Sequence, residues 1–444
     1  MTRSETRTLL RLAGPIILSN LGFMGMATVD ILLLGNLSPA ALAVAGIAHS
    51  MAFFLLSFGI GMVQGLDPVL SQAVGAGDRR QFRLGMQRGL LMALVVGGGI
   101  GLLLLPGALW HRLLGQPPEL EGQVVLYLRS LALGMPFWLF FNLFARALQA
   151  HHKTRPIVLA VLFGNLLNLG LDLWLIYGGM GVPPLGAVGS ALATTLVRGL
   201  MVLFLLWIAW PVLGPSLLPW RPDVLQLKAF RRLVRITFPS ALQVFLEGGG
   251  FSAIMFLVGR FGAGAAASHQ VALNLASLTF MVPLGLGAAV AVRVGNGIGK
   301  NKPGQVRHAA RIGLWLGTAF MSCSALLFLL APRALAALYS QDPEVLALAS
   351  SLIPLAGFFQ VFDGLQVVAS GILRGTGDTR TPMLGHLVAF WILGIPMGIL
   401  LSGPLSLGVQ GLWGGLVIAL ALCSSFLVWR ARVTLARPLT RLKV

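Results

Sequence analysis

The sequence predicts an all-α polytopic membrane protein, with 12 transmembrane helices in two pseudo-symmetric six-helix bundles. The first observation is composition: 57% of the 444 residues are hydrophobic and only 10% are charged, whereas soluble domains carry roughly 25% charged residues. Such an apolar chain would expose surfaces that water does not tolerate but that lipid accepts. The other two observations are the spacing of the apolar stretches and a repeat between the two halves.

Twelve apolar stretches are long enough to cross a bilayer, which takes about 20 mainly apolar residues per helix. Short polar breaks separate them, and each break marks the end of one predicted span and the beginning of the next. In chain order the predicted spans are residues 12–34, 41–66, 84–106, 124–147, 156–178, 186–210, 235–258, 267–292, 308–330, 346–372, 383–402 and 407–429.

The basic residues predict the orientation of these spans. Of the 32 Lys and Arg residues, 27 lie before the first span or after an even-numbered span. Only four are assigned to the opposite side, and Arg198 lies in the middle of a span. Because basic loops stay on the cytoplasmic side, both termini are expected to be cytoplasmic. The net charge of +19 is then explained by loops that face anionic lipid, and no nucleic-acid partner is expected.

The two halves of the chain repeat each other. Residues 11–90 match residues 235–314 at a constant offset of 224, with 16 identities and no gap. The matched pairs include Arg11 and Arg235, Pro15 and Pro239, and Gly61 and Gly285. Six spans separate the copies, so both halves have the same orientation, as in transporters built from parallel repeats. The predicted organisation is an N-terminal lobe at 1–210, a cytoplasmic linker at 211–234 and a C-terminal lobe at 235–444, with a duplicated scaffold lacking alternating access as the alternative.

Acids inside spans are the candidate functional residues. A charged residue at a helix centre costs about 2.5 to 3.5 kcal/mol on insertion scales, so each one needs a reason. Asp30, Asp172, Glu247 and Asp363 lie well inside spans. Asp67, before Pro68, lies near the cytoplasmic end of span 2, and we interpret it as a structural residue.

In the N-terminal half, Asn168 precedes Asp172 by four residues, so both side chains lie on one helix face. With Asp30 they predict an oxygen-lined pocket. A carboxyl group in apolar surroundings can carry a proton, and one with amide and hydroxyl partners can ligate Na+. Hydrogen bonds that only join neighbouring helices are the alternative.

In the C-terminal half, Glu247 and Asp363 have no acidic counterparts in the repeat. At the offset of 224, Glu247 corresponds to Phe23, and Asp30 corresponds to Ile254. The acids are therefore not a by-product of duplication, which favours function over inherited packing. No Lys lies inside any predicted span, and a cavity with surplus negative charge attracts cations.

The other polar residues of the predicted spans are weaker evidence of a functional role. His269 and His386 could shuttle protons, but a lone histidine in a span is more often a packing residue. Cys323 and Cys423 lie in apolar runs and predict neither a disulfide framework nor a metal site. We find no nucleotide loop, no His-Glu-x-x-His motif and no nucleophile with a base, so neither an enzyme nor a cofactor is expected.

Five segments carry a resemblance to a known family. They are SQAVGAGD at 71–78, LDLWLIYG at 171–178, SHQVALN at 268–274 with VPLGLG at 282–287, and GTGDTR at 375–380. Over nearly its whole length the chain resembles the multidrug and toxic compound extrusion (MATE) family, with its NorM-like bacterial branch as the nearest group. The resemblance implies the MATE fold, with two six-helix lobes around a central V-shaped cavity.

The resemblance also implies secondary active antiport, in which organic cations or drugs leave in exchange for Na+ or H+ by alternating access. In NorM-like members the acids of spans 1, 7 and 10 take part in coupling, and Asp30, Glu247 and Asp363 match them. Members with a site in the N-terminal lobe use an Asn/Asp pair in span 5, matched by Asn168 and Asp172. The candidate Na+ ligands are therefore Glu247 and Asp363, or Asp30, Asn168 and Asp172.

The expected surroundings and partners follow from this resemblance. We expect organic cationic small molecules as cargo, no cofactor beyond the coupling ion, and a monomer in the bilayer of the bacterial cytoplasmic (inner) membrane. The alternative is a flippase for lipid-linked or other amphipathic substrates of the same wider superfamily. A flippase for anions would need an Arg or Lys that faces the cavity, and Arg198 is the candidate that the predicted spans offer.

Overall fold

A computed structural model describes residues 2–179 and 181–442, and side chains from residue 5 on. Eleven of its helices are long and apolar enough to span a membrane. A bent pair, Pro118–Ala132 and Met135–Ala150, with 41° between its parts, makes a twelfth. Within these residues the extended pairing is limited to an isolated bridge between Gly179 and Val182. The predicted all-α class and the predicted spans are confirmed.

The helices follow the predicted spans in order. The first half contains α1 (Thr2–Leu37), α2 (Pro39–Gln64), α3 (Asp67–Gly75), α4 (Arg79–Leu104), α5 (Gly107–Leu113), η1 (Pro118–Leu120), α6 (Glu121–Ala132), α7 (Met135–Ala150), α8 (Arg155–Tyr177) and α9 (Gly186–Leu217). The second half contains η2 (Pro222–Leu225), α10 (Leu227–Gly259), α11 (Ala263–Gly299), α12 (Pro303–Leu330), α13 (Pro332–Ala337), α14 (Pro343–Thr376), α15 (Arg380–His386), the π-helix η3 (Leu387–Gly394), α16 (Ile395–Ser402) and α17 (Gly408–Ala436).

The segment predicted as a linker, 211–234, is largely helical. Helix α9 continues through Pro211 and Pro215 to Leu217. A proline removes one backbone donor but does not stop a helix whose side chains are held by packing, and Leu213 is fully buried here. The connection between the halves is therefore shorter than the sequence suggests.

The chain divides into two compact units, and each takes one segment from the other half of the sequence. The N-unit consists of residues 18–241, and the C-unit consists of residues 2–17 and 242–442. Leu9, Leu12 and Ile16 of α1 lie in an apolar core of the C-unit. Leu233 and Ala241 of α10 lie in the core of the N-unit. The predicted lobes at 1–210 and 235–444 follow the repeat, whereas the packing boundaries fall inside α1 and α10.

Matching glycines make room for the exchanged segments. A Cβ on Gly61 of α2 would lie 2.6 Å from the Cα of Ala241. A Cβ on Gly285 of α11 would lie 3.0 Å from the backbone nitrogen of Ile17. Gly61 and Gly285 are partners in the repeat, and so are Ile17 and Ala241. Each crossing therefore depends on the absence of a side chain, which explains why these glycines occur in both copies.

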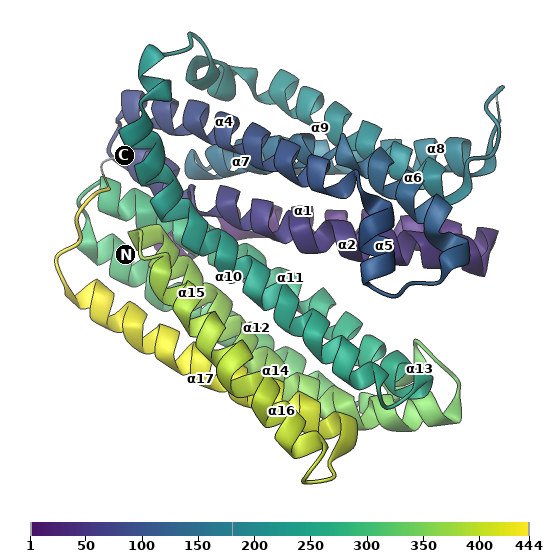
Figure 1. The fold of residues 1–444 in the computed structure, drawn as a ribbon. Coiled ribbons are helices and arrows are strands. Elements are labelled where there is room, and N and C mark those ends of the chain that lie inside the picture. Colours follow the sequence, from purple (N-terminus) through teal and green to yellow (C-terminus); the bar gives the residue numbers. More distant parts are fainter. Residues whose placement is uncertain (1, 180, 443–444) are drawn as a thin grey trace. The chain divides into compact units, whose positions relative to one another are not determined.

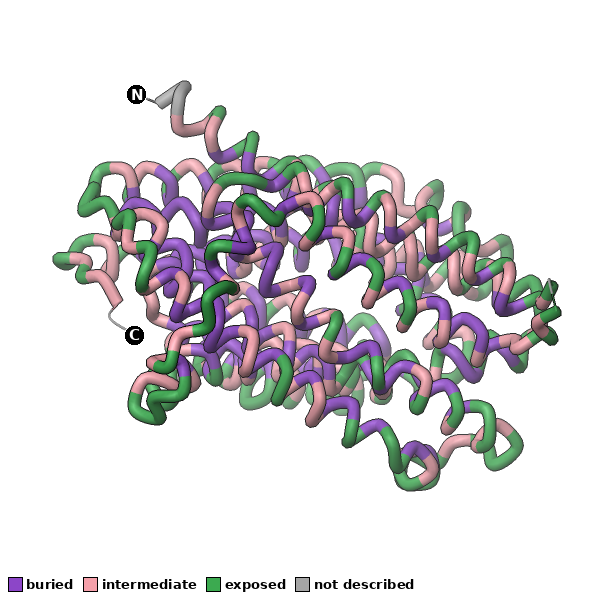
Figure 2. Tube along the Cα trace, turned by 90° about the horizontal axis from the view of Figure 1, so that it is seen from above, coloured by how far each residue is buried: buried purple, intermediate pink, exposed green. Residues whose placement is uncertain are grey.

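Within each unit the long helices pack side by side (Figure 1). In the N-unit α8 packs against α9 and α4 against α7, and in the C-unit α14 lies between α11, α12 and α17. Buried and exposed residues alternate along the helices (Figure 2). Large apolar side chains are among the most exposed, including Leu166 and Trp207, each 75% exposed. An apolar outer surface of this kind suits lipid.

Candidate functional site

The N-unit brings Asp30, Asn168 and Asp172 together, as the sequence predicted. The two carboxyl groups and the Asn168 amide lie near one another, with Ser190 and Thr194 of α9 beside them. Asn168 and Asp172 are fully buried. One Asp30 oxygen, both Asp172 oxygens, both polar Asn168 atoms and the Ser190 hydroxyl are buried without a hydrogen-bond partner among the described residues.

Arg198 supplies a positive charge to the same cluster. Its guanidinium lies over the Trp138 ring, 5.3 Å from the ring centroid, and approaches the Met135 sulfur at 3.9 Å. It interacts electrostatically with Asp30. A cation held on an aromatic face in this way is fixed in place, so Arg198 offsets part of the negative charge of the N-unit acids.

The C-unit brings Glu247 and Asp363 together through an amide. Gln366 lies three residues after Asp363 on α14, and the same Nε2 donates to Glu247 Oε1 at 2.9 Å and to Asp363 Oδ1 at 3.2 Å. One turn further along, Gln243 of α10 donates to Ser370 of α14 at 3.5 Å. A polar ladder therefore joins α10 to α14.

His386 faces the other oxygen of Glu247. Its Nε2 lies 3.6 Å from Glu247 Oε2, and its Nδ1 lies 2.7 Å from the carbonyl of Pro382. Because a carbonyl only accepts, Nδ1 carries a proton and Nε2 is the atom turned toward the carboxyl group. His386 is fully buried and stacks on Phe390, within the π-helix that follows it. Such π-segments occur frequently at functional sites.

The two clusters differ in how they suit a coupling ion. Na+ is a hard cation that prefers oxygen ligands. The N-unit offers several buried oxygens that lack a protein donor. In the C-unit, N–H groups and a ring nitrogen already face the carboxyl oxygens. Among the described residues no group of three or more His, Cys, Asp or Glu side chains could hold a metal ion.

Two buried side chains outside the clusters have their own partners. Gln360 of α14 accepts from the hydroxyls of Thr279 at 2.7 Å and Ser324 at 2.8 Å. The Nδ1 atom of His269 accepts from the Trp413 indole at 3.1 Å. His269 thus acts as a packing residue, as the sequence indicated, whereas His386 contacts an acid.

Asp67 is a buried structural acid. It begins α3 directly before Pro68, and its carboxylate lies 3.4 Å from the Arg146 guanidinium of α7. The Asp67 side chain is buried, at 1% exposed, and that of Arg146 is largely covered, at 12% exposed. The ion pair fixes the end of the second span, in agreement with the structural role that the sequence suggested.

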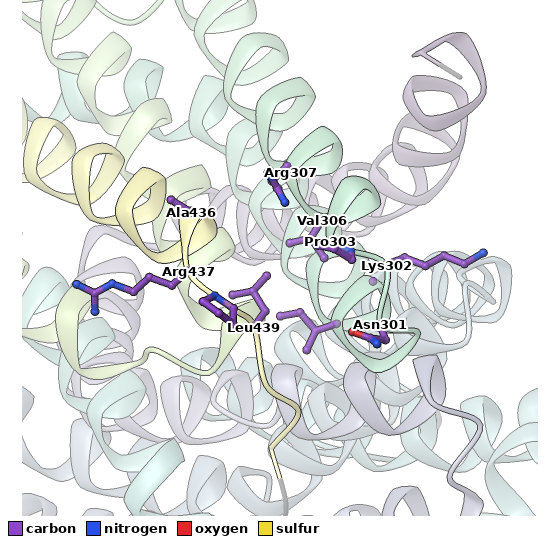
Figure 3. A pocket seen from close by; sticks show the side chains of 11 residues that line it. Asn301, Lys302, Pro303, Val306, Arg307, Ala436, Arg437 and Leu439 are labelled. Atoms are coloured by element: carbon purple, nitrogen blue, oxygen red, sulfur yellow. The ribbon is translucent and has the colours of Figure 1, made fainter.

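A separate pocket of about 380 Å³ lies at one end of the C-unit, between the α11–α12 turn and the end of α17. Its lining includes Asn301, Lys302, Val306, Arg437 and Leu439. Figure 3 shows the Lys302 and Arg437 side chains extending in opposite directions from this pocket. The charges do not converge, so the pocket lacks the arrangement of an anion site.

Sequence reasoning missed Gln366 and undervalued His386. The spacing of three residues from Asp363 was a usable signal for Gln366, because residues three apart share a helix face. His386 lies 139 positions from Glu247 in a different helix. Only the 3.6 Å distance between its Nε2 and Glu247 Oε2 shows that it reaches an acid of the cluster.

Comparison with sequence families and curated proteins gives one consistent result. The family described as MatE matches residues 15–174 and 239–400. Multidrug resistance protein MdtK of Pectobacterium atrosepticum is 32% identical over 453 residues, covering 99% of this chain and 98% of MdtK. Multidrug resistance protein PmpM of Pseudomonas aeruginosa is 35% identical over 437 residues, covering 94% of this chain and 89% of PmpM.

Solved structures agree on the fold. The eukaryotic MATE transporter AtDTX14 superposes with a TM-score of 0.89 at 23% identity, covering 98% of this chain and 96% of the other. An outward-facing multidrug resistance MATE family transporter of the MOP superfamily gives a TM-score of 0.88 at 19% identity, covering 97% and 96%. At these identities the likeness concerns the fold alone.

Proposed function

Because the chain belongs to the MATE family, we propose that it is a secondary active antiporter that exports organic cations in exchange for Na+ or H+. The cargo class is supported by its similarity to MdtK and PmpM, both named multidrug resistance proteins. The observation that carries the proposal is the pair of acid clusters, each with one buried carboxyl group: Asp172 in the N-unit and Asp363 in the C-unit. Buried acids without structural ion pairs mark ion and substrate pathways in membranes.

The proposed mechanism uses competition at the acids. A cationic cargo and the coupling ion both seek the same negative charge, so they do not bind together. Binding of the ion displaces the cargo and neutralises the acids, and it shifts the population toward the opposite-facing state by its differential affinity. The residues proposed to bind the coupling ion and the cargo are Glu247 and Asp363 in the C-unit, and Asp30, Asn168 and Asp172 in the N-unit.

The first test is ion-driven transport of a fluorescent organic cation, such as ethidium. The full chain in proteoliposomes is given a Na+ gradient at equal pH, and separately a pH gradient without Na+. Movement under the Na+ gradient alone assigns Na+ as the coupling ion, and movement under the pH gradient alone assigns H+. No movement under either gradient contradicts the antiport proposal.

Variants locate the site. Glu247→Gln and Asp363→Asn each remove one C-unit charge, and Asp30→Asn and Asp172→Asn do the same in the N-unit. Glu119→Gln is the matched control, because Glu119 is an exposed acid of η1 outside the long helices. We expect ion-driven efflux to fall in the variants of the coupling unit and to stay at the wild-type level in the control. Full efflux in all four acid variants would refute the site assignment.

The flippase alternative has less support. Its candidate cation, Arg198, is engaged with Trp138 and Met135 and interacts with Asp30, so its charge is already partly offset. A headgroup-labelled phospholipid that crosses the bilayer in proteoliposomes while ethidium does not would favour this alternative.

We further propose that the protein is a monomer in the bacterial cytoplasmic membrane, with both termini in the cytoplasm. The asymmetry of the basic loops supports this orientation, and the bacterial relatives support the membrane. In the C-unit both termini lie at the same end, where Figure 1 marks N and C. Labelling of single cysteines at residues 5 and 440 in intact and in permeabilised cells checks the orientation.

A further inference from the structure

We propose that Gln366 is a built-in competitor of the coupling ion: its amide occupies the C-unit carboxyl groups in the empty transporter and keeps ion binding weak enough for release. This inference rests on the proposed function, since it concerns how the same acids take up and lose their ion. Gln366 is a positioning residue, because it acts through Glu247 and Asp363.

The geometry of the amide supports this role. Nε2 directs one hydrogen to Glu247 Oε1 and the other to Asp363 Oδ1, at 2.9 and 3.2 Å. Gln366 is 1% exposed, so the amide itself is withdrawn from solvent. Both N–H bonds of the amide thus serve the two acids of the site, one on α10 and one on α14.

The direction of the effect is the same for both ions. Hydrogen bonds from N–H groups stabilise a carboxylate in its anionic form and so oppose the uptake of a proton. Na+ seeks the same oxygens, and the positive ends of the N–H dipoles repel it. The Gln366 hydrogen bonds therefore have to break before either ion can bind Glu247 or Asp363.

The amide is free to leave. Gln366 Oε1 is buried and has no hydrogen-bond partner among the described residues, so turning the amide breaks no hydrogen bond at its oxygen. Rotation about the last side-chain bond turns the Nε2 donors away from the two acids. An amide of this kind competes with the ion in the empty site without blocking the loaded one.

Gln360 lies six residues earlier on the same helix and provides a contrast. It is also fully buried, but its Oε1 accepts from two hydroxyl groups, which fix its orientation. No hydrogen bond joins it to Glu247 or Asp363 among the described contacts. A substitution at Gln360 therefore tests the loss of a buried amide on α14 without changing the donors at the acids.

The test measures the affinity for the ion and the rate of transport in the full chain. Gln366→Met keeps the length of the side chain and removes both donors. We expect the ion concentration that half-saturates ethidium efflux to fall about tenfold, since two hydrogen bonds no longer oppose the ion, and the maximal rate to fall because the ion leaves slowly. Gln360→Met should leave the half-saturating concentration unchanged.

A second variant and a direct measurement support the test. Gln366→Glu has nearly the same shape but offers oxygens in place of donors, so it should also bind the ion more tightly. Ion uptake without dye is measured with radioactive sodium, or by pH change in weakly buffered solution. An unchanged or weaker ion affinity in both Gln366 variants overturns the inference, and so does an equal gain in Gln360→Met.

The wild type separates this inference from the proposed function. If wild-type protein moves no ethidium under either gradient, the proposed function fails. If wild-type protein is ion-driven and the Gln366 variants keep its ion affinity, only the role of Gln366 fails. Damage to folding alone would lower both affinity and rate, and a rise in affinity does not result from it.

Discussion

Replacement of Gly61 or Gly285 by alanine should destabilise the protein by about 3 kcal/mol each, the upper part of the range for overpacked sites. The Cβ of Gly61→Ala would lie 2.5 Å from the Ser240 carbonyl oxygen and 2.6 Å from the Ala241 Cα. The Cβ of Gly285→Ala would meet the backbone of Ile17 at 3.0 Å. Backbone atoms cannot turn away as a side chain can, so a whole helix has to shift.

Gly98→Ala on α4 is the matched control. No atom lies within 4 Å of a Cβ at Gly98, and alanine in a helix interior is favoured over glycine by about 0.5 to 1 kcal/mol. The assay is the loss of the monodisperse peak in size-exclusion chromatography after heating in detergent. The argument from close approach is refuted if Gly61→Ala and Gly285→Ala survive heating as well as Gly98→Ala.

Three further predictions concern charged and titratable side chains. Asp67→Ala should lower the free energy of unfolding by about 3 kcal/mol, because it leaves the largely covered Arg146 guanidinium without its 3.4 Å partner. Adding Arg146→Met should restore most of the protein that survives heating. His386→Gln should lower ion-driven efflux while ethidium binding persists, because it changes the group that faces Glu247. Efflux equal to that of the wild type at every pH would contradict this prediction. Burial lowers the pKa of His151 below 6.5, so the unfolded chain takes up a proton at this residue more readily than the folded chain does. The contribution of His151 to stability is therefore complete above about pH 6.5 and is lost as the pH falls below that value. His151→Gln should flatten this part of the curve of stability against pH.

Much of the fold could be predicted because lipid imposes a simple rule on the sequence. Every spanning segment has to satisfy its backbone internally, so apolar length alone located the helices. Helix α9 extends beyond the predicted span, through Pro211 and Pro215 to Leu217, and the burial of Leu213 accounts for the added turns. The π-helix η3 could not be predicted, since its eight residues, Leu387–Gly394, also suit an α-helix.

The candidate site was partly predictable for a related reason. The cost of burying a charge made Asp30, Asp172, Glu247 and Asp363 conspicuous. Neutral partners carry no such cost signal. Spacing on the helix pointed to Gln366, whereas His386 could be recognised only from its distance to Glu247. The role of the five assigned site residues remains a prediction until the transport variants are measured.

The exchanged segments have a consequence for biosynthesis. A ribosome makes Leu9, Leu12 and Ile16 first, but their core partners, among them Leu286, Val290 and Ile372, come from α11 and α14. The opening turns of α1 therefore lack their apolar partners until more than half of the chain has been translated. For the same reason a fragment made from residues 235–444 alone would lack part of its own core, and co-expression of residues 1–17 is the addition that should restore it.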